Sequence, residues 1–303
     1  MTNFDSSRLD KYIKRKYGNI PQSIIEKAIR NKDILLNGKK VQSSTQVTDN
    51  DNVFIHPNII KVFQIVNSNN IKQTNNVKNY STYLDTFKQM IIYEDNNLVI
   101  INKPSGLAVQ LGSKTKIALD VMAKAYNPEL RLVHRIDKDT SGITIMVKNL
   151  KTARYMLLVF RNKLIQKKYI ALLSKVLTKS SGTINAPLFK CKDRVLVDEI
   201  KGKEAITNYK VIRNVNGCSL IEAIPLTGRT HQIRVHMAHI GAPILGDSKY
   251  DGKKNKHLFL HAYEVSFKDI NTHSLIKIKA PLPEYMSSCS NIILYNNESI
   301  MTL

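Results

Sequence analysis

The spacing of apolar residues along the first sixty positions predicts two short helices followed by strands. Apolar side chains recur at helical intervals over 9–16, and Gly18 is typical of the end of such a helix. Pro21 suits the first turn of a second helix, whose apolar face runs to Ile29. Asn37-Gly38 between apolar residues predicts a β-hairpin, and Val53–Ile55 predicts one more strand. This part of the chain therefore predicts a small module of two helices and a sheet.

The pattern changes after this module. Residues 60–86 are rich in Asn, Lys, Ser and Thr with little periodicity, which predicts a linker between a domain at 1–59 and another at 87–303. The second domain mixes strand-like and helix-like runs without a regular alternation, so we expect an α+β fold with a central mixed, mostly antiparallel sheet. The expected strands are 98–102, 143–148, 169–174, 205–212, 219–225 and 275–279, and the expected helices are 151–163 and 230–240.

The charge balance indicates a polyanionic partner. The 303 residues include 46 Lys and Arg against 24 Asp and Glu, a net charge of +22. Such an excess attracts nucleic acid, with an anionic membrane surface as the competing partner. No apolar stretch is long enough to span a bilayer, so no membrane association is expected. Three widely spaced cysteines fit reduced thiols in the cytoplasm better than disulfides or a metal site.

Basic residues recur along both predicted helices and into the hairpin of the N-terminal module. A solvated helix face would also carry such charges, but their recurrence favours a surface that binds RNA phosphates. The candidate RNA-binding residues are Arg8, Lys11, Arg15, Arg30, Lys32 and Lys39.

One acidic residue in the second domain lies between two cations on a turn. Asp137 follows Arg135 and precedes Lys138, and Thr140 to Gly142 lead into an apolar strand. Fixed positive charge nearby favours an ionised carboxylate, and a loop between strands presents a reactive group from a rigid base. A surface ion pair on an ordinary turn is the alternative.

The motif His134–Gly142 resembles the catalytic motif of the RluA-type pseudouridine synthases, with Ile136 where the usual form has Leu. Further blocks occur in the order found in that family: 102–107, 166–172, 228–236, 246–250 and 260–262. Residues 7–57 resemble an S4-type RNA-binding domain. The resemblance implies isomerisation of uridine to pseudouridine in a flipped nucleotide, which requires no cofactor and no metal.

The resemblance also implies roles for individual residues. Asp137 is the expected catalytic carboxylate, and it could attack the sugar, attack the base or abstract a sugar proton. Tyr169 would stack on the uracil near its C5 proton, and Arg234 would pair with the carboxylate through two donors. The expected substrate-binding residues are Arg135, His134, Arg229, His231 and Leu260.

Other sites are disfavoured by spacing. The histidines at 231, 236 and 239 lack a nearby cysteine or carboxylate to complete a zinc site. Residues 103–106 lack the order of a Walker motif, and His134–Asp137 lacks the glycine-rich loop that precedes a kinase catalytic loop.

We therefore expect a cytoplasmic, monomeric RNA pseudouridine synthase that acts on large-subunit ribosomal RNA near the peptidyl-transferase centre. A relative that modifies another helix of the same RNA is the first alternative, and a tRNA-directed enzyme is the next. From another class, the chain could be a non-catalytic RNA-binding factor in ribosome assembly.

Overall fold

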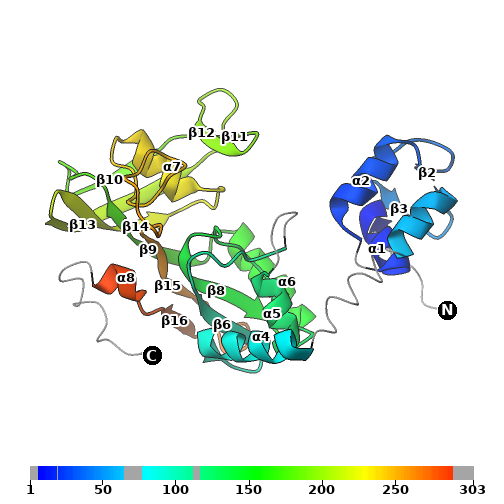
Figure 1. Ribbon diagram of the computed structural model, residues 1–303, viewed down its shortest axis with the longest axis horizontal. Helices are drawn as coiled ribbons and strands as arrows, with labels where there is room; N and C mark the ends of the chain where they lie inside the picture. Colours follow the sequence, from blue (N-terminus) through cyan, green and yellow to red (C-terminus); the bar gives the residue numbers. More distant parts are fainter. Residues whose placement is uncertain (1–5, 19, 65–76, 112–116, 289–303) are drawn as a thin grey trace. The chain divides into compact units, whose positions relative to one another are not determined.

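The computed structural model describes residues 6–18, 20–64, 77–111 and 117–288, and the chain divides into two compact units. The N-terminal unit comprises residues 1–81, and the C-terminal unit comprises residues 82–303 (Figure 1). Each unit has its own hydrophobic core, so each is described by itself.

Two helices, a further helical segment at 57–64 and short strands surround one core in the N-terminal unit. Leu9, Ile13 and Ile25 are fully buried there, and they are the apolar positions that the helical spacing singled out. A strand pair of β1 with β3 and another of β2 with β4 complete the unit, both antiparallel. The elements are β1 (Ser7–Arg8), α1 (Leu9–Tyr17), α2 (Gln22–Arg30), β2 (Ile34–Leu36), β3 (Gln46–Val47) and β4 (Val53–Ile55).

The hairpin predicted at Asn37-Gly38 forms only as a turn. Asn37 and Gly38 have φ of 52° and 73°, the left-handed values that a tight turn requires, and Leu36 forms a bridge with Lys39. The strand does not continue beyond that bridge, because β2 pairs with β4 instead. The local turn signal was right, but the pairing partner was wrong.

The linker predicted over 60–86 is corrected at both ends. Residues 57–64 are helical, and Phe63 is fully buried in the core of the N-terminal unit. At the other end, helix α4 (Val77–Met90) covers the last ten residues of the prediction, and Phe87 just beyond it is buried in the second core. Residues 65–76, in the middle of that stretch, lie outside the described residues.

The C-terminal unit is built on one large sheet with the strand order β10-β13-β14-β9-β15-β8-β6-β5. Strand β16 pairs with β15, β7 pairs with β8, and all of these pairings are antiparallel except β15 with β8. The mixed, mostly antiparallel sheet is thus confirmed. The strands are β5 (Ile91–Glu94), β6 (Leu98–Lys103), β7 (Arg131–Leu132), β8 (Ser141–Val147), β9 (Gln166–Leu173), β10 (Ser181–Asn185), β13 (Ile206–Val215), β14 (Cys218–Pro225), β15 (Leu260–Lys268) and β16 (Leu275–Lys279).

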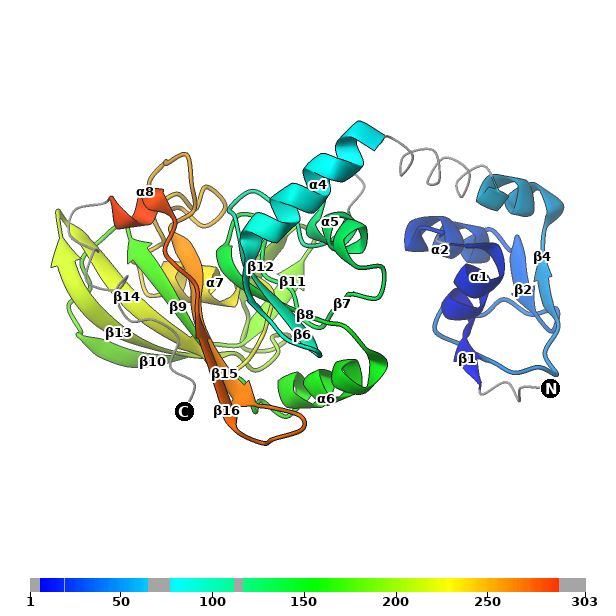
Figure 2. The ribbon, with the colours of Figure 1, turned by 90° about the horizontal axis from the view of Figure 1, so that it is seen from below.

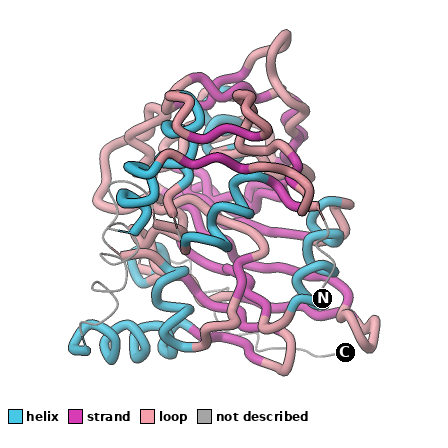
Figure 3. The backbone as a smooth tube through the Cα atoms, turned by 90° about the vertical axis from the view of Figure 1, so that its right-hand side faces the viewer, coloured by secondary structure: helices cyan, strands magenta, loops and turns pink. Residues whose placement is uncertain are grey.

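Helices cover the two halves of this sheet separately. Figures 1 and 2 place α4, α5 (Leu119–Tyr126) and α6 (Leu150–Arg161) around the half that contains β6 and β8. Helix α7 (Gln232–His239) packs against β13 and β14 in the other half and also contacts β12 (Arg194–Val197), which pairs with β11 (Leu188–Cys191). A short helix, α8 (Glu284–Ser287), follows β16. Long strands dominate the unit, as the colouring of Figure 3 shows.

The two halves meet where β8 runs parallel to β15, and Gly142 makes this contact possible. Gly142 has φ of 105°, and a Cβ added there would lie 2.3 Å from the carbonyl oxygen of Ala262. Only glycine accepts both the backbone angle and the close approach. The motif glycine therefore joins the loop that carries Asp137 to the middle of the sheet.

Candidate active site

A cavity of about 780 Å³ opens in the C-terminal unit beside the β8–β15 junction. Its walls come from the segment 133–138, from β9 and from residues 225–234. The structure brings every residue predicted for catalysis or substrate binding to this one cavity, a group formed by Asp137, Tyr169, Arg234, Arg135, His134, Arg229, His231 and Leu260.

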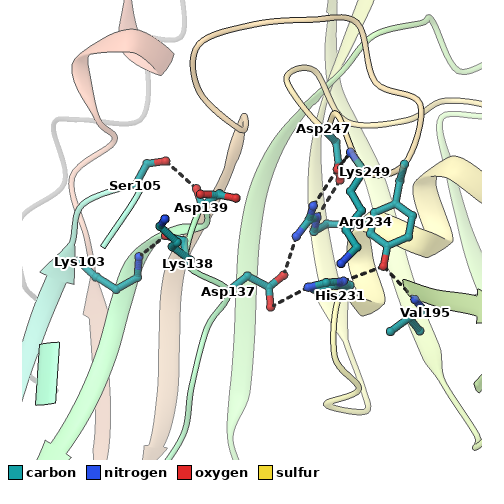
Figure 4. A network of polar contacts seen from close by, with 11 residues as sticks. Lys103, Ser105, Asp137, Lys138, Asp139, Val195, His231, Arg234, Asp247 and Lys249 are labelled. Carbon is teal, nitrogen blue, oxygen red and sulfur yellow. Dashed lines mark hydrogen bonds and ion pairs between the residues drawn. The ribbon is translucent and has the colours of Figure 1, made fainter. Parts of the chain in front are cut away.

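Asp137 lies between two basic side chains (Figure 4). Nη1 of Arg234 donates a hydrogen bond to one carboxylate oxygen at 3.3 Å, and Nε2 of His231 lies 3.8 Å from the other. The Asp137 side chain is 24% exposed, so it remains open to the cavity. These contacts fix the orientation of a carboxylate that faces a space large enough for a nucleotide.

Arg234 makes its bidentate hydrogen bonds to Asp247, whereas the sequence predicted them to Asp137. Nε and Nη2 each donate to Asp247 at 2.8 Å, which leaves Nη1 for the single hydrogen bond to Asp137 (Figure 4). Asp247 is 1% exposed, and its contacts raise the pKa of Arg234 despite burial. The predicted pair of Arg234 with Asp137 is present, but Asp247 provides the bidentate partner that holds the guanidinium in place.

A chain of hydrogen bonds continues from His231 away from the cavity. Nδ1 of His231 lies 2.6 Å from the hydroxyl of Tyr250, whose oxygen also accepts the backbone N–H of Val195 at 3.2 Å. Burial lowers the pKa of His231, which favours the neutral ring. The arrangement that satisfies these groups has Tyr250 donating to Nδ1, so that the Nε2 proton points toward Asp137.

Neighbouring residues of the 228–236 block serve the scaffold. The side chain of Gln232 accepts from the Thr227 hydroxyl at 2.7 Å and donates to the carbonyl of Ile206 at 2.9 Å. His236 is fully buried, with its ring nitrogens within hydrogen-bond distance of Thr207 and Ala186. Helix α7 supplies Arg234 to the site and Gln232 and His236 to the core, and His231, the residue just before the helix, also faces the site.

The segment 103–106 anchors the loop that carries Asp137. The Nζ of Lys103, a fully buried side chain, donates to the carbonyls of Pro104, Leu107 and Lys138 at 2.8–3.0 Å, and burial lowers its pKa to about 7. The hydroxyl of Ser105 donates to the carbonyl of Asp139 at 2.7 Å (Figure 4). This explains the first sequence block without assigning it to phosphate binding.

His134 serves the loop as well as the cavity. Its Nε2 accepts the backbone N–H of Ile145 at 2.8 Å, and its ring stacks on Phe160 with centroids 4.9 Å apart. Burial lowers its pKa to about 3, so the ring is neutral. The accepting nitrogen ties the start of the loop to β8, and the substrate-binding role of His134 stays a prediction.

Tyr169, Leu260, Arg135 and Arg229 form other parts of the wall. Burial and the charge of Asp137 raise the pKa of Tyr169, which keeps its phenol protonated. Leu260 is 3% exposed and presents an apolar surface. Arg135 and Arg229 are exposed, and each makes one side-chain hydrogen bond, to Gln110 and to the carbonyl of Glu204.

Three residues of the site escaped the sequence prediction: Asp247 and Tyr250, which hold Arg234 and His231 from behind the cavity wall, and Lys167, which lines the cavity. The first two lie in the block 246–250, which was identified but assigned no role. Lys167 is two residues from Tyr169 on β9, and alternation along a strand places both on the same face. This alternation was the sequence signal that could have identified Lys167 as a residue of the site.

All six predicted RNA-binding residues of the N-terminal unit are exposed. Arg8 forms a two-pronged ion pair with Asp10, at 3.2 and 2.7 Å, and the Asp10 side chain is only 9% exposed. The Arg8 side chain thus partly serves to stabilise the fold of this unit through Asp10. Lys11 and Arg15 lie one helical turn apart on α1 and present their charges on one face.

Two negative findings concern the described residues alone. Within them, no group of three or more His, Cys, Asp or Glu side chains is arranged to hold a metal ion. The helices that the structure describes include none with the length and apolar character to cross a membrane.

Comparison with known proteins shows the family to which the chain belongs. Residues 97–239 match the family model described as RNA pseudouridylate synthase, and residues 7–53 match the S4 domain. The chain belongs to the RNA pseudouridylate synthase family, and it is therefore an isomerase that converts uridine to pseudouridine in RNA.

Relatives match over nearly the whole chain. A protein of Rickettsia bellii named ribosomal large subunit pseudouridine synthase C is 35% identical, covering 93% of this chain and 96% of the relative. Proteins of the same name from Rickettsia prowazekii and Vibrio vulnificus are 37% and 35% identical, covering 92% of this chain and 95% and 90% of the relatives. Among solved structures, human RNA pseudouridylate synthase domain containing 4 aligns with a TM-score of 0.60 at 25% identity, covering 69% of this chain and 95% of its own.

Proposed function

We propose that this protein isomerises specific uridines of large-subunit ribosomal RNA to pseudouridine, near the peptidyl-transferase centre. The relatives named ribosomal large subunit pseudouridine synthase C support this target, because they match both units of the chain. An exposed basic N-terminal unit and a net charge of +22 suit a large RNA substrate.

The observation that carries the proposal is the position of Asp137. Its carboxylate faces a cavity of about 780 Å³ and is oriented by Arg234 and His231. Breaking the bond between the ribose and uracil requires a carboxylate near the sugar and a space in which the detached base can rotate. A base inside a helix cannot reach such a space, so the target nucleotide is flipped into the cavity.

The other residues of the wall receive roles from their chemistry. Tyr169 stacks on the uracil as a protonated phenol near C5, and Leu260 provides an apolar surface beside the base. Arg234, held by Asp247, keeps Asp137 in position. Arg135 and Arg229 are exposed at the cavity and contact the RNA backbone around the flipped nucleotide.

The protein is further proposed to act in the cytoplasm as a monomer without a cofactor. The reaction rearranges bonds within one nucleotide and transfers no electrons, so it requires no redox group. Sedimentation of the pure protein with and without RNA would check the monomer, and a stable dimer would contradict it.

Release of the C5 proton provides the test of the function. The protein is mixed with large-subunit RNA carrying tritium at C5 of uridine, and tritium in the water is measured. We expect release by the unmodified protein and by Asp139→Asn, whose exposed carboxylate lies two residues from the site. Asp137→Asn should abolish release. Undiminished release by Asp137→Asn would overturn the assignment.

Mapping of pseudouridines in large-subunit RNA from cells with and without the protein tests the target. In cells without the protein, we expect pseudouridines near the peptidyl-transferase centre to be missing. Loss in another helix of the same RNA would favour a D-type large-subunit enzyme, and loss in tRNA would favour a tRNA-directed one. Binding of RNA with no release of tritium would favour a non-catalytic assembly factor.

A further inference from the structure

Lys167 is a half-buried cation to which the site as described so far assigns no role. It lies on β9 two residues before Tyr169, and its side chain lines the same cavity. Its one polar contact within the described part of the chain is a long hydrogen bond, 3.5 Å, from Nζ to the carbonyl of Thr227. The ammonium group therefore retains donors that no protein group uses.

The next residue on the strand, Lys168, has its charge paired with carboxylates. Lys168 lies 3.4 Å from Glu222 and 3.7 Å from Glu264, two carboxylates on neighbouring strands. Alternation along β9 turns Lys168 away from the face that Lys167 shares with Tyr169. Two adjacent lysines thus have opposite surroundings: one is paired with acids, and the other faces the cavity.

The protein groups around Lys167 disfavour a positive charge at this position. Burial lowers its pKa, and the neighbouring His134 ring offers no negative charge. A cation in such a position is costly unless an anion or an electron-rich oxygen reaches it. Gly228 leaves space there, because a Cβ at that position would lie 3.9 Å from Nζ. The space next to the ammonium belongs to the substrate cavity.

We propose that Lys167 donates a hydrogen bond to a carbonyl oxygen of the target uracil and stabilises the negative charge that develops on the base. This inference rests on the proposed function and names the group that receives the leaving base. Tyr169 on the same strand face contacts the ring, and Lys167 contacts its polar edge.

The electron count of the reaction explains why a cation belongs there. When the bond between C1′ and N1 breaks, its electron pair stays with the uracil and spreads over N1, O2 and O4. A new bond then forms between C5 and C1′, C5 loses its proton, and N1 ends with one. Negative charge accumulates on the uracil oxygens whether Asp137 attacks the sugar, attacks the base or removes a sugar proton. A preorganised donor at one of these oxygens lowers the barrier in every case.

Single-turnover tritium release from C5-labelled large-subunit RNA tests the proposal, with protein in excess and RNA affinity measured in parallel. Lys167→Met should reduce the rate constant at saturating protein by roughly 10²–10³-fold, the usual effect of removing one charge-stabilising donor, while RNA affinity changes little. Lys167→Arg restores a cation and should recover at least about tenfold of that loss.

Lys210→Met is the matched control, since it removes a cation from an exposed position of β13 outside the cavity. It should leave the saturated rate constant within about threefold. Thermal melting of all variants confirms that they fold.

Two results would overturn the proposal. One is an unchanged rate constant in Lys167→Met. The other is weaker RNA binding with a smaller salt slope and a normal rate at saturation, which would assign Lys167 to a backbone phosphate. If the unmodified protein released no tritium, the proposed function itself would fail, and this outcome is distinguishable from both.

Discussion

Arg234 divides its donors between two acids, and this division decides how the site tolerates mutation. Three of its hydrogen bonds come from one planar group: two hold it on Asp247 and one reaches Asp137. A guanidinium is suited to this geometry because its donors point in fixed directions. The resemblance supplied the pair with Asp137, whereas the role of Asp247 depends on a fold that brings two distant loops together.

Arg234→Lys should therefore reduce turnover more than it reduces stability. Lysine keeps the charge but cannot donate along three fixed directions, so Asp137 loses its orientation. We expect a loss of about 10²-fold in the rate of tritium release, about 2.7 kcal/mol in activation free energy. Asp247→Asn should lower the rate in the same direction, because it weakens the anchor without touching the cavity. Normal turnover with a large fall in melting temperature would show a purely structural role for Arg234.

The half-buried histidine at 134 makes stability dependent on pH. Its pKa falls from an ordinary value near 6.5 to about 3 in the folded protein, so below pH 6.5 the unfolded chain binds more protons. The contribution of neutral His134 to the free energy of unfolding is fully present above pH 6.5 and is lost progressively as the pH falls toward 3. At pH 5 this histidine alone accounts for a loss of about 2 kcal/mol.

His134→Gln checks this dependence, because Gln keeps an acceptor for the Ile145 N–H but does not titrate between pH 5 and 7.5. Urea unfolding at the two pH values should show a smaller loss of stability at pH 5 in the variant than in the unmodified protein. An identical loss in both would mean that His134 is not the titrating group. His261, whose pKa burial lowers to about 4, contributes a similar dependence and stays intact in the variant.

At the scale of elements, the junction of β8 and β15 is the most demanding contact in the sheet. Gly142→Ala would place a Cβ 2.3 Å from the carbonyl of Ala262 on a backbone with φ of 105°. We expect a loss of about 2–4 kcal/mol in the free energy of unfolding. Gly217→Ala is the control, since Gly217 has φ of 75° but open space around it, and should cost only about 1 kcal/mol. Equal losses in urea unfolding would contradict the close-contact explanation.

Periodicity predicted the local elements well and their partners poorly. The strand expected at 275–279 coincides with β16, and the helix expected at 151–163 matches α6 within two residues at each end. The central strand β15 was absent from the predicted strands, although its first three residues were recognised as a motif. Residues 263–268 alternate apolar and polar side chains, so the strand signal was available, but the alternation changes phase after Ala262, where the pairing with β9 also shifts register.

The linker prediction failed for a related reason. Residues 57–64 include Ile59, Ile60 and Phe63, which pack in the core of the N-terminal unit, and residues 77–90 include Phe87 and Met90, which are buried in the C-terminal unit. Composition averaged over the whole of 60–86 gives these apolar positions little weight beside the polar residues between them. Tertiary packing therefore decides such segments more than local preference does.

At the scale of the whole molecule, positive charge on the N-terminal unit should govern the salt dependence of RNA binding. Replacing both Lys11 and Arg15 by Gln removes two exposed charges from one face of α1. If both contact phosphates, the slope of log affinity against log salt should decrease by about 1.4–1.8. Lys88→Gln with Lys268→Gln removes the same charge from exposed positions outside the cavity and should leave the slope nearly unchanged. Equal slopes in the two double variants would argue against α1 as an RNA anchor.

The pairing of β8 with β15 also sets the order in which a nascent chain becomes competent. Ser141 and Gly142 lie beside His261 and Ala262, about 120 residues later, and Leu260 completes the cavity wall. Asp137 leaves the ribosome long before the strand that completes its surroundings. A chain released before residue 260 would carry the reactive carboxylate without a finished cavity, and activity therefore requires synthesis to pass this strand.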